Sequence, residues 1–206
     1  MTTILYLVRH GQSVMNTLNI VQGNDHADSW NGLSDVGIAQ ANDIANKLTQ
    51  VTFDVCYHSP LQRAEETAKY IIASRGIPVS SHPKFRDKAM GDSAGKAINA
   101  INEAYTNWDK ITEDERLDIK LFPNEESQRE LRVRSLAIVH EIASLNQGKT
   151  ILIVTHGSFI RSLYIYLSNK SIGDLNRFDN CGYMILEYTN TLKIISTYKL
   201  SLKIQT

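Results

Sequence analysis

The chain has 206 residues, a length that suits one domain or one domain with a small insertion. Hydrophobic residues make up 42% of the sequence and charged residues 21%, which are ordinary values for a globular protein. The formal net charge is zero, which argues against a broad electrostatic surface for nucleic acid or for an anionic membrane. A small anion is not excluded, because two or three local cations are enough to bind it.

The two cysteines, Cys56 and Cys181, form no CxxC pair, so neither a zinc site nor a disulfide framework is expected. The apolar run at residues 4–8 is too short for the core of a signal peptide. No run approaches the roughly 18 apolar residues that a membrane span needs. We therefore expect a cytoplasmic protein that binds neither a membrane nor nucleic acid.

Apolar periodicity and turn residues predict strands that alternate with helices along most of the chain. Ser59 is expected to cap a helix that begins at Pro60. The run at 150–155 is so apolar that both faces of its strand must be buried. The expected strands are residues 3–8, 51–57, 77–80 and 150–155, followed by a hairpin of 183–188 and 192–199. The expected helices are residues 35–49, 60–73, 96–110, 127–145 and 159–167.

This alternation predicts an α/β fold, a three-layer α/β/α sandwich with a mostly parallel central sheet. We expect a single domain over residues 1–206, in which the polar segment at about 88–126 is an insertion or a cap over the core. In such sheets, ligands bind outside the carboxyl ends of the strands. Residues that directly follow the apolar runs are therefore candidates for a functional site.

Two histidines and two arginines occupy such places. Arg9 and His10 follow the first strand, His156 follows the strand at 150–155, and Arg63 lies one turn into the helix after the second strand. Hydrolysis of a phosphate ester spreads negative charge over three equatorial oxygens, to which arginine side chains can donate in pairs. A neutral histidine with one unprotonated nitrogen is a competent nucleophile. These residues together predict phosphoryl-group chemistry.

Four segments, in order along the chain, resemble the motifs of the histidine phosphatase (phosphoglycerate mutase-like) superfamily. They are Leu7-Val8-Arg9-His10-Gly11-Gln12-Ser13 with Asn16, Ser59-Pro60-Leu61-Gln62-Arg63-Ala64 with Thr67-Ala68, Phe122-Pro123 with Glu126-Ser127 and Arg134, and Val154-Thr155-His156-Gly157-Ser158. A weaker fifth similarity lies at Asn180-Cys181. A lone Arg-His-Gly triplet would be weak evidence, whereas four ordered motifs are specific.

The resemblance implies that His10 is phosphorylated and that Arg9, Arg63 and His156 hold the phosphoryl oxygens, with Asn16 near the same oxygens. It implies no metal and no organic cofactor. It also implies the three-layer sandwich that the pattern of elements predicts. Three further residues are expected to contribute to phosphate binding, namely Gln22, Gly23 and Gly157.

The sequence departs from the family pattern at the expected general acid. The family's usual glutamate corresponds to Asp87, whose side chain is one methylene shorter. The segment after it, at 91–95, lacks the family's aromatic residue and second glutamate. The loop from Gln22 to Leu33 is a few residues longer than usual. Because such loops select the substrate in this family, the identity of the substrate is poorly predicted.

Three functions are compatible with these residues. The first is a phosphatase that acts on a small phosphorylated metabolite or a phosphopeptide, with Asp87 as the general acid. The second is a phosphoglycerate mutase, which the short chain disfavours. The third is a weakly active regulatory protein that binds a phosphorylated ligand, suggested by Asp87 and the altered loop. We expect a small phosphorylated substrate as partner and leave a homodimer open.

Overall fold

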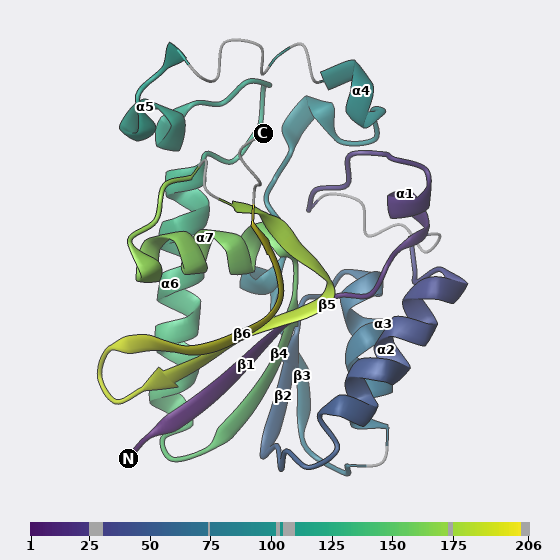
Figure 1. The fold of residues 1–206 in the computed structure, drawn as a ribbon, viewed down its shortest axis with the longest axis vertical. Helices are drawn as coiled ribbons and strands as arrows, with labels where there is room; N and C mark the ends of the chain where they lie inside the picture. Colours follow the sequence, from purple (N-terminus) through teal and green to yellow (C-terminus); the bar gives the residue numbers. More distant parts are fainter. Residues whose placement is uncertain (25–30, 74, 102–103, 105–109, 173–174, 203–206) are drawn as a thin grey trace.

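The computed structural model describes residues 1–24, 31–73, 75–101, 104, 110–172 and 175–202 (Figure 1). The described strands are β1 (Thr3–Arg9), β2 (Val55–His58), β3 (Val79–Ser81), β4 (Thr150–Thr155), β5 (Leu175–Tyr188) and β6 (Leu192–Leu202). They form one sheet in the order β3-β2-β4-β1-β5-β6. The first four strands of that order pair in parallel, and β5 pairs antiparallel with both β1 and β6. The prediction of a mostly parallel sheet is confirmed.

Helices cover both faces of the sheet, as a three-layer sandwich requires (Figure 1). One face packs against α2 (Asp35–Lys47) and α3 (Gln62–Ile72). The other face packs against α6 (Gln128–Leu145) and α7 (Gly157–Ser168). Each face therefore has its own apolar core, and the sheet is buried between the two.

Strand β4 shows why the sequence requires helices on both faces. Successive side chains of a strand point to opposite sides of the sheet. Ile151 and Ile153 belong to the core beneath α6 and α7, whereas Leu152 and Val154 belong to the core beneath α2 and α3. All four side chains are fully buried. An apolar strand without alternation is thus stable only at the centre of the sheet.

The register of the parallel strands brings their carboxyl ends to one edge. Arg9 at the end of β1 pairs with Thr155 at the end of β4, and His58 at the end of β2 pairs with Val154. The chain leaves all three strands at this edge. His10 and His156, which come directly after β1 and β4, therefore emerge side by side.

The described part of segment 88–126 lies beyond this edge (Figure 1), and its role as a cap stays a prediction. Its described elements are the 3-10 turn η2 (Gly91–Ser93) and the short helices α4 (Ile98–Ile101) and α5 (Glu113–Asp118). The helix predicted over 96–110 is observed as α4, and residues 102–103 and 105–109 lie outside the described residues. The described part of the segment thus borders the place where the two histidines emerge.

Several predicted boundaries differ from the structure for local reasons. Helix α3 begins later than predicted, with Leu61 as its N-cap residue, while the Ser59 hydroxyl accepts the Leu61 amide at 3.3 Å and also contacts His156. Strand β3 is an exposed edge strand, so only three residues pair. Strand β5 begins at Leu175, earlier than predicted, and continues through a bulged region. Four short helical segments of the described residues were not predicted, namely α1 (Val14–Thr17), the 3-10 turn η1 (Pro83–Phe85), η2 and α5.

No helix in the described ranges combines the length and apolar character that a membrane crossing requires.

Candidate active site

A cavity of about 510 Å³ opens at the carboxyl edge of the sheet. Arg9 and His10 reach it from the end of β1, Arg63 lies beside it from α3, and His156 precedes α7. All four side chains are buried, and the rings of the two histidines lie 5.2 Å apart between centroids. The structure therefore brings the predicted cluster together. The predicted residues that line the cavity are Arg9, His10, Asn16, Gln22, Gly23, Asp87 and Gly157.

His10 is held in one orientation by its own backbone neighbourhood. Its Nδ1 lies 2.7 Å from the Gly11 carbonyl oxygen. A carbonyl oxygen can only accept a hydrogen bond, so Nδ1 must carry the proton of the neutral ring. The Asn180 side-chain amide donates to the His10 carbonyl oxygen at 3.0 Å and fixes the main chain there. The unprotonated Nε2 consequently faces the arginines.

The His10 ring is neutral in this setting. Burial lowers the pKa of His10 well below its usual value of 6.5, and the positive charge of Arg63 lowers it further. The Arg63 Nε–H donates to His10 Nε2 at 3.3 Å. A nitrogen that accepts a hydrogen bond from a cation is unprotonated, and its lone pair becomes the nucleophile once the Arg63 N–H turns to a phosphoryl oxygen.

Arg63 links the elements around the cavity. Its side chain is 1% exposed, which is rare for an arginine and requires partners for the guanidinium. One terminal nitrogen donates to the Gly23 carbonyl oxygen at 3.1 Å, and the same nitrogen lies 3.5 Å from Asp87 Oδ2. Helix α3, which carries Arg63, also contacts the Arg-His-Gly segment, because the Thr67 hydroxyl accepts a hydrogen bond from the Gly11 amide at 3.0 Å. Arg63 is thus a rigid cation.

His156 does not line the cavity itself, but its Nδ1 lies 3.7 Å from Asp87 Oδ2, which does. Its Nε2 lies 2.7 Å from the Ser59 hydroxyl, and its buried Nδ1 has no hydrogen bond to the part of the chain that the structure describes. Burial lowers the pKa of His156 well below 6.5, with Arg63 the next cause. The neutral ring can therefore accept from Ser59 at Nε2 and carry its proton on Nδ1.

Arg9 and Gly157 are in close contact. A Cβ atom at residue 157 would lie 3.2 Å from Arg9 Nε and would press on the guanidinium. Arg9 also donates to the Phe178 carbonyl oxygen, which fixes the side chain across the start of α7. Glycine at position 157 thus lets the main chain at the start of α7 approach the guanidinium.

Asp87 lines the cavity at the end of the loop that follows η1. Its Oδ2 lies 3.5 Å from an Arg63 terminal nitrogen and 3.7 Å from His156 Nδ1. The second distance is too long for a hydrogen bond, and a neutral His156 makes no ion pair. Oδ1 accepts the Lys88 backbone amide at 2.9 Å. One oxygen is thus held by the main chain, and the other points toward the histidines.

The three weaker candidates serve mainly as supports in the structure. The side-chain carbonyl oxygen of Asn16 accepts hydrogen bonds from the Ser13 amide and hydroxyl at the start of α1. Asn16 also lines the cavity. Gln22 Oε1 accepts from Ser13 and from Asn31. Gly23 has a φ of 99° and uses its carbonyl oxygen to hold Arg63. Their direct contact with a phosphoryl group stays a prediction.

Sequence reasoning missed two polar residues of the cavity, Gln128 and Arg161. Arg161 lies four residues after Gly157 and thus on the same face of α7, a spacing that could have pointed to it. Gln128 begins α6, directly after the Ser127 cap. Both side chains also line a smaller pocket of about 220 Å³, together with Lys88 and Glu125. No group of three or more metal-ligating His, Cys, Asp or Glu side chains occurs among the described residues.

The structure is a three-layer sandwich with two buried histidines and two arginines at its carboxyl edge. This arrangement is typical of enzymes that transfer or hydrolyse phosphoryl groups. A family comparison is more specific, since the model of the histidine phosphatase superfamily, branch 1, matches residues 5–200. The chain belongs to this superfamily. The predicted family and fold are therefore confirmed, and so is the predicted class, a metal-independent histidine-type phosphatase.

Similar proteins include both phosphatases and a mutase-like protein. The chain is 32% identical to phosphoglycerate mutase-like protein 4 of Arabidopsis thaliana, over 78% of this chain and 69% of the relative. It is 29% identical to a metal-independent phosphoserine phosphatase of the same plant, over 82% and 70%. The solved structure of YhfR from Bacillus stearothermophilus superposes with a TM-score of 0.82 at 25% identity, over 94% of this chain and 95% of that chain.

Solved structures of a similar protein, a phosphoserine phosphatase of Entamoeba histolytica, contain phosphoserine or 3-phosphoglyceric acid, which agrees with the small phosphorylated substrate expected for this chain. The predicted cytoplasmic location, the homodimer and the lack of a nucleic-acid partner stay predictions.

Proposed function

We propose that the protein hydrolyses small phosphate monoesters through a phosphohistidine formed on His10. The observation that carries the proposal is the orientation of the His10 ring. Its Nδ1–H is bound by the Gly11 carbonyl oxygen, so Nε2 faces the cavity with its lone pair, next to Arg63. A buried neutral imidazole beside fixed cations is suited to attack a dianionic phosphoryl group.

The first half of the reaction transfers the phosphoryl group. His10 Nε2 forms a bond to phosphorus while the bond from phosphorus to the leaving oxygen breaks. Arg9 and Arg63 stabilise the charge on the equatorial oxygens, and the His156 Nδ1–H donates to one of them. Asp87, in its acid form, gives its proton to the leaving oxygen. The alcohol then departs, leaving phosphohistidine and the Asp87 carboxylate.

The second half returns the enzyme to its starting state. The Asp87 carboxylate takes a proton from a water molecule, whose oxygen attacks phosphorus in line with the His10 Nε2 bond. That bond breaks, inorganic phosphate is released, and His10 is again neutral. One aspartate can serve both halves, because the proton that it gives up in the first half is restored in the second; its Oδ2 lies 3.5 Å from an Arg63 nitrogen and 3.7 Å from His156 Nδ1, which supports the proposal.

Phosphate release from a panel of esters tests the proposal. The panel contains p-nitrophenyl phosphate, phosphoserine, phosphoglycerates and sugar phosphates. We expect measurable release with the wild type and none above background with His10→Ala, whose folding is checked by thermal unfolding. Activity that persists in pure His10→Ala protein would contradict the assignment of the nucleophile.

A phosphoglycerate mutase is the second candidate, because a phosphoglycerate mutase-like protein is among the relatives. A mutase would move the phosphoryl group between hydroxyls of phosphoglycerate with little net release of phosphate. Binding of esters without turnover would instead favour the regulatory alternative. The same panel, with the products identified by NMR, separates all three.

A further inference from the structure

We propose that Lys88 and Glu125 are positioning residues for the proton transfer by Asp87. Their buried ion pair holds the main chain next to Asp87 against segment 121–126, so that the carboxyl group stays within reach of the leaving oxygen. Neither residue is among those that line the catalytic cavity, so both act through Asp87 and not on the substrate. The inference rests on the phosphatase mechanism proposed above and deepens it.

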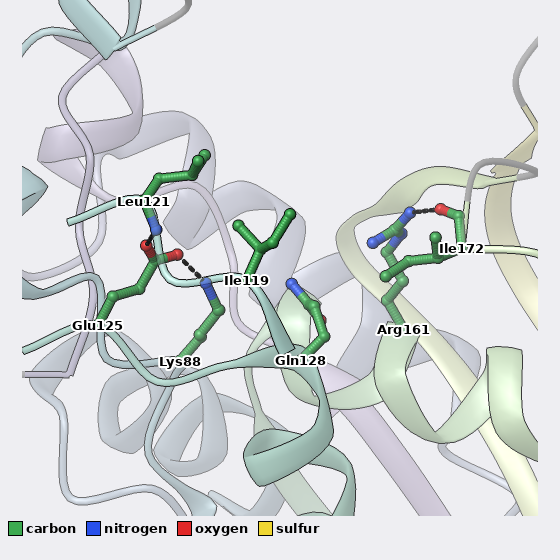
Figure 2. A pocket seen from close by; sticks show the side chains of 7 residues that line it. All are labelled: Lys88, Ile119, Leu121, Glu125, Gln128, Arg161 and Ile172. Atoms are coloured by element: carbon green, nitrogen blue, oxygen red, sulfur yellow. Dashed lines mark hydrogen bonds and ion pairs between the residues drawn. The ribbon is translucent and has the colours of Figure 1, made fainter. Parts of the chain in front are cut away.

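The ion pair lies in the interior of the protein. The Lys88 and Glu125 side chains are 7% and 3% exposed, and the ammonium group contacts Glu125 Oε1. Figure 2 draws this contact as a dashed line on one side of the smaller pocket of about 220 Å³. Lysine and glutamate are almost never buried to this extent unless they are paired. Separation of the two groups would leave buried charges without compensation, so the pair stays together.

The Glu125 carboxylate is fixed to the main chain of its own turn. Its second oxygen, Oε2, accepts the Leu121 and Phe122 amides at 2.7 and 3.1 Å, and Figure 2 shows the bond to Leu121. The Glu125 amide in turn donates to the Phe122 carbonyl oxygen at 3.3 Å. Because both carboxylate oxygens have partners, Glu125 offers Lys88 an acceptor in one fixed place.

Lys88 connects this acceptor to the general acid. Its backbone amide donates to Asp87 Oδ1 at 2.9 Å, so the main chain at residue 88 orients the carboxyl group. Its side chain pairs with Glu125 and thereby anchors the same stretch of main chain. The other oxygen of the carboxyl group, Oδ2, lies 3.5 Å from an Arg63 nitrogen and 3.7 Å from His156 Nδ1. A displacement of residue 88 would consequently displace both oxygens.

Main-chain contacts beyond Lys88 hold the two segments together without the ion pair. The Glu126 amide donates to the Ala89 carbonyl oxygen at 2.9 Å, and the Asp92 amide donates to the Pro123 carbonyl oxygen at 3.1 Å. A Cβ atom at Gly91 would lie 2.0 Å from the same Pro123 oxygen, so the segments approach very closely. The distinct contribution of the ion pair is therefore to fix the residue that directly follows Asp87.

Lys88→Met tests the positioning role, because methionine has a similar length and no charge. We expect kcat for the alkyl phosphate with the highest turnover in the panel to fall about ten- to one-hundredfold, the loss that a misplacement of about 1 Å can cause. For p-nitrophenyl phosphate kcat should fall less than about threefold, because that leaving group needs little help from an acid. Glu125→Gln, which keeps an oxygen for the Leu121 and Phe122 amides, should act in the same direction.

The Asp87→Asn background separates a positioning role from a general loss of stability. If Lys88 acts through the acid, its substitution has nothing further to remove once that acid is gone. We therefore expect Lys88→Met to lower kcat for the alkyl phosphate by less than about twofold in Asp87→Asn. A residue that only stabilises the fold would lower kcat for both esters alike in both backgrounds.

Lys84→Met is the matched control. Lys84 lies in the same loop and pairs with Glu141 at 3.5 Å, but both side chains of that pair are about half exposed. An exposed ion pair contributes little to the position of either residue, because water solvates both charges. Turnover of both esters should therefore stay unchanged in Lys84→Met.

Equal losses of kcat on the two esters in Lys88→Met and Glu125→Gln would overturn the positioning role, as would an undiminished loss in the Asp87→Asn background. If the single variants do not fold, the double variant Lys88→Met/Glu125→Gln buries no charge at either position and should still show the selective loss. Wild-type turnover of p-nitrophenyl phosphate reports the phosphatase itself. No release from any ester would refute the phosphatase, whereas release without a selective loss in the variants would refute the positioning role alone.

Discussion

At the residue scale, the two histidines of the site have the same neutral charge and opposite hydrogen-bonding roles. The Gly11 carbonyl oxygen accepts a hydrogen bond from His10 Nδ1–H, so the lone pair of that ring is at Nε2. Ser59 contacts His156 at Nε2, so that ring can present an N–H at Nδ1. One ring is thereby suited to attack phosphorus and the other to stabilise an oxygen. Neighbouring atoms, and not residue type, assign these roles.

Asp87→Asn tests the general acid. An amide cannot donate the proton that a poor leaving group needs, whereas nitrophenolate departs with little help. We expect kcat/KM for an alkyl phosphate to fall about 10²- to 10⁴-fold and that for p-nitrophenyl phosphate to fall by less than about tenfold. Steady-state kinetics on both esters provide the measurement. Equal losses on the two esters would remove Asp87 from the acid role.

The phosphoryl end of the site was predictable from sequence because its residues directly follow buried strands. Arg9, His10 and His156 are placed by strand register alone, and Arg63 by one turn of helix. Arg161 was not predicted, since its position depends on how α7 and segment 88–126 enclose the cavity. The contact of the Ser59 hydroxyl with His156 was not predicted, because His156 is 97 residues away in the chain.

At the element scale, one side chain of α6 holds the loop that carries Asp87. Arg134 donates to the Lys84, Arg86 and Asp87 carbonyl oxygens at 2.7, 3.0 and 3.2 Å. It also makes two hydrogen bonds with the Glu126 carboxylate, both of 2.8 Å. Glu126 Oε2 in turn accepts the Ala89 amide at 3.2 Å. The position of Asp87 therefore depends on a residue that lines no part of the cavity.

Arg134→Gln tests this positioning role. Loss of the charged contacts should lower the free energy of unfolding by about 1–3 kcal/mol. It should also lower kcat for an alkyl phosphate more than for p-nitrophenyl phosphate, because a displaced Asp87 affects the proton transfer. Denaturant unfolding and kinetics on the two esters give the readouts. Equal kinetic losses on both esters would leave Arg134 with a structural role only.

The accuracy of each predicted strand or helix depends on whether its local sequence pattern or its contacts with distant residues decide where it begins and ends. The central strands and long helices were predicted within a few residues, because their apolar periodicity reports burial directly. Strand β2 begins at Val55 instead of residue 51, since only its last four residues meet β4 and β3. Segment 88–126 was predicted as a polar insertion with one helix over 96–110, whereas its described helices α4 and α5 span too few turns for an apolar period to mark them.

At the scale of the whole molecule, a chain without net charge concentrates buried cations at one edge of its sheet. Two arginines there remain charged, so the two histidines are held neutral by burial and by the arginines. The folded state thus resists protonation of both rings below pH 6.5, while the unfolded chain accepts both protons. Acid therefore stabilises the unfolded state relative to the folded state.

The free energy of unfolding should consequently fall as the pH is lowered through 6.5. Each of the two histidines contributes at most about 1.4 kcal/mol per pH unit, between its unfolded and its lowered folded pKa. His156→Gln should reduce the slope by up to that amount, whereas His140→Gln, outside the site, is the matched comparison. Urea unfolding of the three proteins between pH 7.5 and 5.5 measures the slopes. An unchanged slope in His156→Gln would show that His156 is protonated in the folded protein.

The most direct test of the central claim is to trap the phosphoryl group on the enzyme. The wild type is mixed with its best ester, quenched in base within one turnover and digested for mass spectrometry. We expect one acid-labile, base-stable phosphoryl group on the peptide that contains His10, and none in His10→Ala. A phosphoryl group on another side chain, or turnover without any labelled peptide, would contradict the phosphohistidine mechanism.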